Sequence, residues 1–142
     1  MDIWVSDPLY VDKKSEYNEI TIDTLDCCLK KANYVITCCP LNNHTFHLLN
    51  KDKIILCEKG VKLINVGRGP IIYETDVIEL LENGFIDRVG FDVFEEEALT
   101  QENRLRLFPQ NIFGTHNGSN TLEAVDKVSE TVLKLLKSNI IL

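Results

Sequence analysis

The stretch Val61-Lys-Leu-Ile-Asn-Val66, followed directly by Gly67-Arg68-Gly69, decides the fold. Its apolar run has the length of one buried strand, and it is bounded by glycines. The two glycines around Arg68 let the backbone come close to a ligand at the end of that strand. The stretch therefore predicts a buried strand that delivers a cationic side chain to a site.

Two later runs follow the same plan. Residues 88–93 form an apolar run that precedes Glu97, and residues 111–115 form another that precedes His116. In an open α/β sheet, ligands bind beyond the carboxyl ends of the strands. Arg68, Glu97 and His116 are therefore predicted to lie together at that edge.

The rest of the chain alternates strand-like and helix-like segments, which favours a parallel sheet with helices on both faces. Further strands are expected at residues 3–6 and 34–38, and helices at residues 21–31, 50–58, 74–83 and 121–137. Thr21 or Asp23 is the expected N-cap of the first helix. The third helix is expected to expose Glu74, and the last to bury a stripe of Leu122, Val125, Val128, Val132 and Leu136.

Composition excludes several classes of function. The 142 residues are 44% hydrophobic with a formal net charge of −7, which fits one globular domain and argues against a nucleic-acid surface. Neither a signal peptide nor an apolar run of about 20 residues is found, so a cytoplasmic protein without a membrane contact is expected. The five cysteines make a poor disulfide framework and are expected to be reduced and mostly buried.

The three polar residues match what oxidation of a 2-hydroxy acid requires. Imidazole titrates near neutral pH, so His116 can exchange the hydroxyl proton, with Glu97 orienting the ring and stabilising the imidazolium. The planar fork of Arg68 can hold a carboxylate through two hydrogen bonds. Simpler interpretations stay open: His116 as a structural or exposed histidine, Glu97 as part of a solvated acidic run, and Arg68 as the partner of a structural carboxylate.

Three motifs resemble the D-isomer-specific 2-hydroxyacid dehydrogenase family, to which phosphoglycerate dehydrogenase belongs. They are Asn65-Val-Gly-Arg68-Gly-Pro, Gly90-Phe-Asp-Val-Phe-Glu-Glu-Glu97 and Gly114-Thr-His116-Asn-Gly-Ser, in family order. The resemblance implies an NAD-dependent oxidoreductase of small 2-hydroxy acids, 3-phosphoglycerate being one candidate, and a homo-oligomer. It implies that Arg68 binds the substrate carboxylate, that His116 exchanges the proton and that Glu97 supports His116.

The same resemblance implies the cofactor contacts. Asp7 matches the acidic residue that hydrogen-bonds the adenosine ribose, where a carboxylate favours NAD over NADP. Cys39, Pro40 and Thr45 match the segment beside the dinucleotide. Val66, Gly67 and Arg68 match the approach to the nicotinamide, and Asp92 lies beside it. Asp7-Pro8 alone reads equally well as the start of a turn.

The family's glycine-rich pyrophosphate loop and first strand are expected upstream of Asp7, and Gly67-Arg-Gly69 is a poor imitation of that loop. Residues 1–142 are therefore interpreted as an incomplete Rossmann-like, partial NAD-binding domain without its substrate domain, either a fragment or completed by an N-terminal half. Loss of a central strand leaves a gap of roughly 10 Å. The strands at Ile3 and Lys62 are expected to flank that gap, and either to close up against each other or to leave it to another molecule.

Two other classes of protein compete with this interpretation. Cys38, Cys39, His44 and His47 cluster in the sequence, but adjacent cysteines and a following proline are atypical of a zinc site. No metal is therefore expected. A non-catalytic NAD-binding or interaction protein on the same fold is the remaining alternative.

Overall fold

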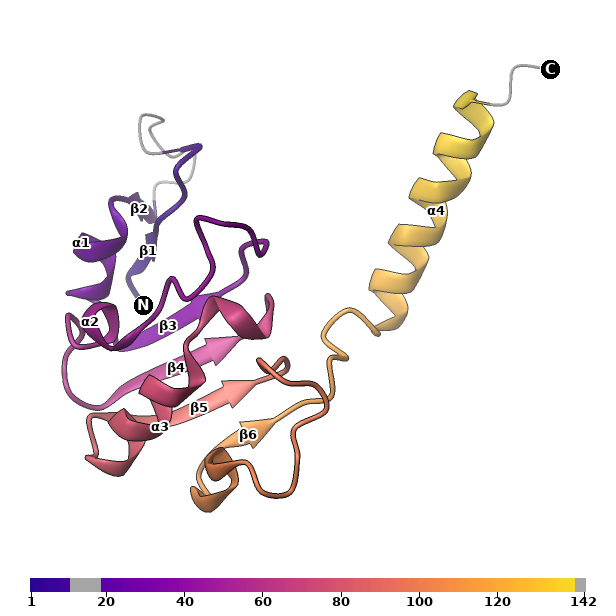
Figure 1. The fold of residues 1–142 in the computed structure, drawn as a ribbon. Coiled ribbons are helices and arrows are strands. Elements are labelled where there is room, and N and C mark those ends of the chain that lie inside the picture. Colours follow the sequence, from indigo (N-terminus) through magenta and orange to yellow (C-terminus); the bar gives the residue numbers. More distant parts are fainter. Residues whose placement is uncertain (11–18, 140–142) are drawn as a thin grey trace.

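The structure is a computed structural model that describes residues 1–10 and 19–139 (Figure 1). Its strands form two separate parallel sheets. In the smaller sheet β1 (Ile3–Val5) pairs with β2 (Ile20–Ile22). The larger sheet has the order β3 (Tyr34–Thr37), β4 (Val61–Asn65), β5 (Ile86–Phe91) and β6 (Ile112–Phe113). The predicted α/β fold with a parallel sheet is therefore confirmed.

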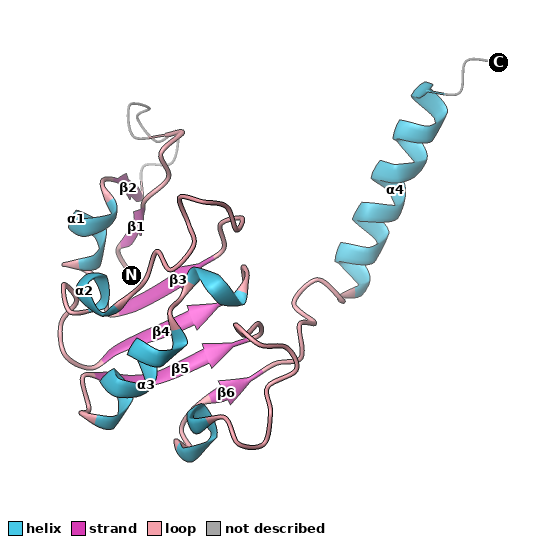
Figure 2. Ribbon diagram, viewed as in Figure 1, coloured by secondary structure: helices cyan, strands magenta, loops and turns pink. Residues whose placement is uncertain are grey.

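Strand β4 lies inside the larger sheet, with β3 on one side and β5 on the other. Val61, Leu63 and Asn65 are buried on one face, whereas Lys62 and Ile64 are only half-buried on the other. Figure 2 shows α2 (Lys51–Ile54) and α3 (Glu74–Glu82) packed over the sheet. The main core lies between these helices and the strands, because the buried side of β4 faces them.

A gap separates the two sheets. Among the described residues, no ladder of hydrogen bonds joins β1 to β3, and Tyr34 and Ile36 on β3 are 58% and 59% exposed. The expectation that Lys62 flanks the gap is wrong, because Lys62 on β4 pairs with Tyr34 on β3. Strands β1 and β3 each keep one edge without a ladder partner at this gap, as β2 and β6 do at the outer ends of the two sheets.

The N-terminal helix is shorter than expected, and residues 20–22 form β2 instead of its first turn. Ile20, Thr21 and Ile22 are β-branched and suit a strand. Helix α1 (Leu25–Leu29) then begins after Thr24, whose hydroxyl accepts a hydrogen bond from the amide of Cys27 at 3.4 Å. The expected caps Thr21 and Asp23 are therefore wrong by one to three positions.

The two middle helices are largely as predicted. Asn50 caps α2 through the Lys53 amide, although the α-helix ends at Ile54 rather than at residue 58. Helix α3 matches the predicted segment closely. The expectation that Glu74 is exposed is wrong. Glu74 is only 7% exposed, because its carboxylate accepts a hydrogen bond from the backbone amide of Glu95. Two short 3₁₀ turns, η1 (Gly69–Ile71) and η2 (Arg104–Leu107), complete the described elements.

Helix α4 (Leu122–Asn139) extends away from the rest of the molecule (Figure 1). The stripe that was expected to be buried is exposed: Leu122 is 82% and Val128 62% accessible. Spacing along a helix reports an amphipathic face but not what covers it. Among the described residues, no helix combines the length and apolar character needed to cross a bilayer.

All five cysteines are free thiols, and the expectation that most are buried is wrong. Cys28 and Cys57 are buried, Cys39 is half-buried, and Cys27 and Cys38 are exposed. Burial raises the pKa of the Cys57 thiol to about 11. Cys27 belongs to a short helix at the surface, and Cys38 follows the end of the edge strand β3, so neither meets the core.

Replacing Leu63 tests the position of the core. Leu63 is 1% exposed at the centre of β4, so Leu63→Ala should lower the free energy of unfolding by about 2–5 kcal/mol through lost transfer energy and a residual cavity. Val128→Ala on α4 should change it by about 0.5 kcal/mol or less. Urea unfolding of both variants checks this, and a larger effect at Val128 would show that α4 is covered.

Candidate functional site

Asn65 holds the loop that carries Arg68. This buried amide accepts hydrogen bonds from the Thr37 hydroxyl at 2.8 Å and from the Gly67 amide at 3.1 Å. Its own NH₂ group donates to the carbonyl of Arg68 at 3.0 Å. No role was predicted for Asn65, although a polar residue at the end of an apolar strand is the signal that could have found it. Asn65 therefore ties the ends of β3 and β4 to the first predicted catalytic residue.

Arg68 is exposed at the carboxyl end of β4, as predicted. One guanidinium nitrogen, Nη1, donates to the carbonyl of Gly67 at 2.8 Å. The next residue, Gly69, packs so closely on the following loop that a Cβ there would lie 1.8 Å from the carbonyl oxygen of Phe94. The loops that carry Arg68 and Glu97 are therefore in direct backbone contact.

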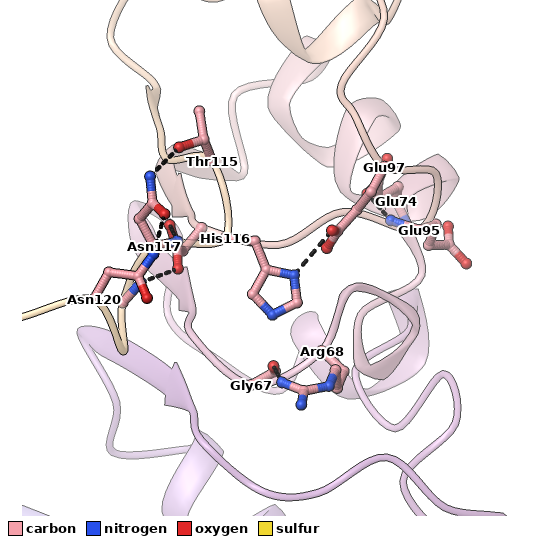
Figure 3. Close-up of polar contacts among 11 residues, drawn as sticks. Gly67, Arg68, Glu74, Glu95, Glu97, Thr115, His116, Asn117 and Asn120 are labelled. Carbon is pink, nitrogen blue, oxygen red and sulfur yellow. Dashed lines mark hydrogen bonds and ion pairs between the residues drawn. The ribbon is translucent and has the colours of Figure 1, made fainter. Parts of the chain in front are cut away.

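His116 and Glu97 form an ion pair or hydrogen bond at the same edge. Nδ1 of His116 lies 2.9 Å from a carboxylate oxygen of Glu97, and the two side chains are 44% and 41% exposed. The contact with His116 holds the pKa of Glu97 below its usual value. Figure 3 shows the imidazole between the Glu97 carboxylate and Arg68. The structure thus brings the three predicted residues together and leaves the second ring nitrogen on the Arg68 side.

Asp92 aims the loop that carries His116. Its carbonyl accepts from the His116 amide at 2.8 Å, and its carboxylate accepts from the amides of Asn117 at 3.1 Å and Gly118 at 2.7 Å. These backbone hydrogen bonds, the one from Asn117 first, lower the pKa of the Asp92 carboxyl. They also hold His116 at a φ of 60°, a left-handed conformation that is unusual for histidine.

The predicted cofactor residues other than Asp92, which follows β5, lie after the ends of β1, β3 and β4. Asp7 follows β1, and its carboxylate accepts from the Leu9 amide at 2.9 Å, so the turn interpretation of this segment is confirmed. Burial raises the pKa of the Cys39 thiol, and Asp7 is close enough to add to that effect. Thr45 donates to the carbonyl of Pro40 at 2.7 Å and closes the loop after β3.

A pocket of about 510 Å³ opens at the ends of β3 and β4, and five of the predicted residues line it. Its lining consists of Cys38, Cys39, Pro40, Leu41, Val66, Gly67 and Arg68. A Cβ at Gly67 would lie 2.9 Å from the Cys39 carbonyl, so the floor of the pocket is bare, tightly packed backbone. The other three predicted cofactor residues, Asp7, Thr45 and Asp92, lie outside this lining.

The lining of the pocket combines apolar side chains, bare backbone and one cationic side chain. Exposed Val66 and the bare backbone of Gly67 offer a surface for a flat ring beside Arg68. A pyrophosphate has no comparable cradle among the described residues, because Gly69 is taken up by its contact with Phe94. The expectation that Gly67-Arg-Gly69 is not a phosphate loop agrees with this packing.

The zinc alternative gains no support. Within residues 1–10 and 19–139, no group of three or more histidine, cysteine, aspartate or glutamate side chains is arranged to hold a metal ion. Nε2 of His47 lies instead 2.5 Å from a carboxylate oxygen of Glu95.

A parallel α/β sheet with an arginine and a histidine–carboxylate pair at its carboxyl edge is typical of a dehydrogenase domain. The family model for the D-isomer specific 2-hydroxyacid dehydrogenase, NAD binding domain, matches residues 1–118. The chain therefore belongs to this family.

Two curated relatives illustrate the similarity. The chain is 35% identical over 123 residues to glyoxylate/hydroxypyruvate reductase B of Serratia proteamaculans, covering 81% of this chain and 38% of that protein. It is 36% identical over 141 residues to D-3-phosphoglycerate dehydrogenase of Bacillus subtilis, covering 96% of this chain and 27% of that protein. The chain therefore spans about a third of the length of these relatives.

Solved structures share the fold. A glyoxylate reductase from Paecilomyes thermophila superposes with a TM-score of 0.80 at 27% identity, covering 87% of this chain and 38% of that chain. D-Lactate dehydrogenase from Aquifex aeolicus, complexed with NAD and lactic acid, gives a TM-score of 0.81 at 23% identity over 97% of this chain and 46% of that chain. The second match supports the fold alone.

The His116–Glu97 contact predicts a pH effect. Because the pKa of Glu97 is lowered in the folded chain, the contact stabilises the fold above the ordinary carboxyl pKa and is lost as the pH falls through the lowered value. His116→Ala should return the Glu97 pKa toward its ordinary range, as measured by carboxyl-carbon NMR titration. His44→Ala, at an exposed histidine of the loop after β3, is the matched control. An unchanged Glu97 midpoint in His116→Ala would contradict the pairing.

Proposed function

We propose that residues 1–142 are a partial NAD-binding domain of an NAD-dependent oxidoreductase that acts on the CH–OH group of a small 2-hydroxy acid. The observation that carries the proposal is the His116–Glu97 pair, whose imidazole lies beside Arg68 at the carboxyl edge of the sheet. The relatives named glyoxylate reductase and D-3-phosphoglycerate dehydrogenase support a short carboxylic acid as substrate, and 3-phosphoglycerate is one candidate.

Arg68 holds the substrate carboxylate in this proposal. Nη1 of Arg68 donates to the carbonyl of Gly67, and within residues 1–10 and 19–139 the other N–H groups of the guanidinium remain for a bidentate contact. The carbonyl of Arg68 is fixed by Asn65, which limits how far the side chain can move. A carboxylate held there places its neighbouring carbon beside His116.

His116 exchanges the proton of the substrate hydroxyl. Glu97 holds Nδ1, so Nε2 is the atom that takes the proton on oxidation and returns it on reduction. The positive charge that develops on the ring is stabilised by the neighbouring carboxylate. Bound NAD supplies the acceptor for the hydride that leaves the substrate carbon.

The cofactor contacts assigned to this chain belong to the same proposal. Asp7 holds the adenosine ribose hydroxyls, and its carboxylate disfavours a 2′-phosphate. Cys39, Pro40 and Thr45 form the wall beside the dinucleotide, and Val66 and Gly67 receive the nicotinamide. Asp92 lies at the same edge and already aims the His116 loop.

We propose that the partner of this chain is an N-terminal half that completes its NAD-binding domain. The same half would also supply the substrate domain. The facing edges of β1 and β3 are both unpaired within the described residues, and Asp7 and Cys39 show that their carboxyl ends are near each other. One parallel strand between them would join the two sheets. Free cysteines and an acidic surface further support a cytoplasmic location, and the completed protein is proposed to be a homo-oligomer.

Kinetics of a completed protein test the catalytic roles. The chain is fused to the N-terminal half of a relative, and NADH oxidation is followed with glyoxylate, hydroxypyruvate and 3-phosphohydroxypyruvate. His116→Gln should lower kcat by about 100-fold or more because the proton carrier is lost. Arg68→Lys should raise KM about tenfold or more because a bidentate contact becomes a single one.

Arg88→Lys is the matched control for Arg68→Lys, since Arg88 lies within β5 and away from its carboxyl end. It should leave both constants unchanged. Failure of the completed protein to reduce any of these acids, or full activity in His116→Gln, would favour the non-catalytic alternative.

Amide hydrogen exchange tests whether a strand of the N-terminal half fills the gap between β1 and β3. Adding the N-terminal half of a relative in trans should slow exchange of edge amides in β1 (Ile3–Val5) and β3 (Tyr34–Thr37), because a new strand satisfies them. Amides of β4 should change little, since they are already paired. The same half with a proline in its first strand is the control, and equal protection by both would argue against strand addition.

A further inference from the structure

His47 bridges the loops that carry Arg68 and Glu97. Its backbone amide donates to the carbonyl of Pro70 at 2.8 Å, in the turn that directly follows Arg68. Its Nε2 lies 2.5 Å from Oε1 of Glu95, two positions before Glu97. One residue thus contacts both catalytic loops without contacting either catalytic side chain.

The ring of His47 is held rigidly. It stacks on Phe46 at a centroid distance of 3.9 Å and packs against Tyr73 at 4.4 Å. Its φ of 48° is a left-handed conformation that only strong local contacts maintain in a residue with a Cβ. Because Phe46 and Tyr73 hold the His47 ring in place, that ring can anchor the loop that carries Glu95.

Glu95 carries the other half of the bridge. Its second carboxylate oxygen accepts from the amide of Glu74 at 3.0 Å, and its own amide donates to the Glu74 carboxylate at 2.6 Å. Glu74 also accepts from the side chain of Asn103 at 3.4 Å. The loop between β5 and Glu97 is therefore fastened to the start of α3 and to the segment before η2.

Glu96 offers a contrast within the same acidic run. It is exposed, whereas Glu95 is half-buried with its side chain 27% accessible. Burial raises the pKa of the Glu74 carboxyl, and the charges of Glu95 and Glu96 add to the effect, so this cluster of acids is costly without a donor such as His47. A purely solvated acidic run would not be built in this way.

We propose that His47 and Glu95 are positioning residues, which hold the two catalytic loops together so that Glu97 stays against His116 on the Arg68 side. Their effect on turnover rests on the proposed dehydrogenase activity, whereas their effect on the Glu97–His116 contact does not. Neither residue touches the reacting atoms. Each acts through the backbone of a loop that ends at a catalytic residue.

Titration of the Glu97 carboxyl in the 142-residue chain tests the geometry. In His47→Ala and Glu95→Ala the pKa of Glu97 should rise toward its ordinary range, because the loop no longer holds the carboxylate at His116. His44→Ala and Glu96→Ala are matched controls and should titrate as the wild type does. His47→Gln, whose amide can still donate to Glu95, should restore the wild-type midpoint.

Thermal unfolding of the same variants separates positioning from a merely structural role. A lower Tm with a wild-type Glu97 titration in His47→Ala and Glu95→Ala would overturn the proposal. If Glu95→Ala does not fold, Glu95→Gln replaces it, since its amide keeps one acceptor for Glu74 and should give an intermediate shift. The proposal would equally be overturned if the two single variants, Glu95→Gln and His47→Ala, both kept the wild-type titration midpoint of Glu97.

Turnover of the completed protein gives the second readout. His47→Ala and Glu95→Ala should lower kcat about tenfold or more with KM nearly unchanged, since displacement of a catalytic group by 1 Å can lower a rate about 100-fold. Wild-type kcat in both variants would overturn the catalytic part of the proposal. If the wild-type protein is inactive while the Glu97 titration shifts as expected, the proposed function fails and the positioning pair stands.

Discussion

The contact between Gly69 and the backbone of Phe94 is the constraint on which the site depends. A side chain at Gly69 would collide with the Phe94 carbonyl, so only glycine lets the loop after β4 lie directly on the loop after β5. Arg68 and Glu97 flank this contact. Asn65 fixes the loop after β4 through the carbonyl of Arg68. Glu95 fixes the loop after β5 through its contacts with Glu74 and His47. The separation between Arg68 and the His116–Glu97 pair follows from this packing.

Two histidines make similar contacts with different consequences. His116 pairs with Glu97 at an exposed edge and presents its second nitrogen toward Arg68, as a proton carrier must. His47 pairs with Glu95 where both side chains are only 27% accessible, and aromatic rings hold it on both faces. The exposure of the ring and its aromatic contacts distinguish the histidine that is open to a ligand from the one that fastens a loop. Neither difference can be read from the residue type.

Much of the fold was predictable because it depends on local patterns. The apolar runs before Arg68, Glu97 and His116 predicted β4, β5 and β6, and the helical spacing after Tyr73 predicted α3 almost to the residue. The errors arose where tertiary partners decide. Residues 20–22 are a strand because β1 pairs with them, Glu74 is buried because Glu95 donates to it, and the stripe of α4 is exposed because the described residues place nothing against it.

The sequence by itself determined the family motifs, the chemistry available to Arg68, Glu97 and His116, and the presence of a strand before each of them, since these follow from residue type and short-range periodicity. Only the tertiary structure decided that Asn65, Asp92, Glu95 and His47 aim those side chains, because each acts through hydrogen bonds to residues distant in the chain or to backbone groups that no motif reports. It also decided where the sheet is interrupted. Strand β3 pairs with β4 through one edge only, and its other edge, like one edge of β1, has no ladder partner at the gap between the two sheets.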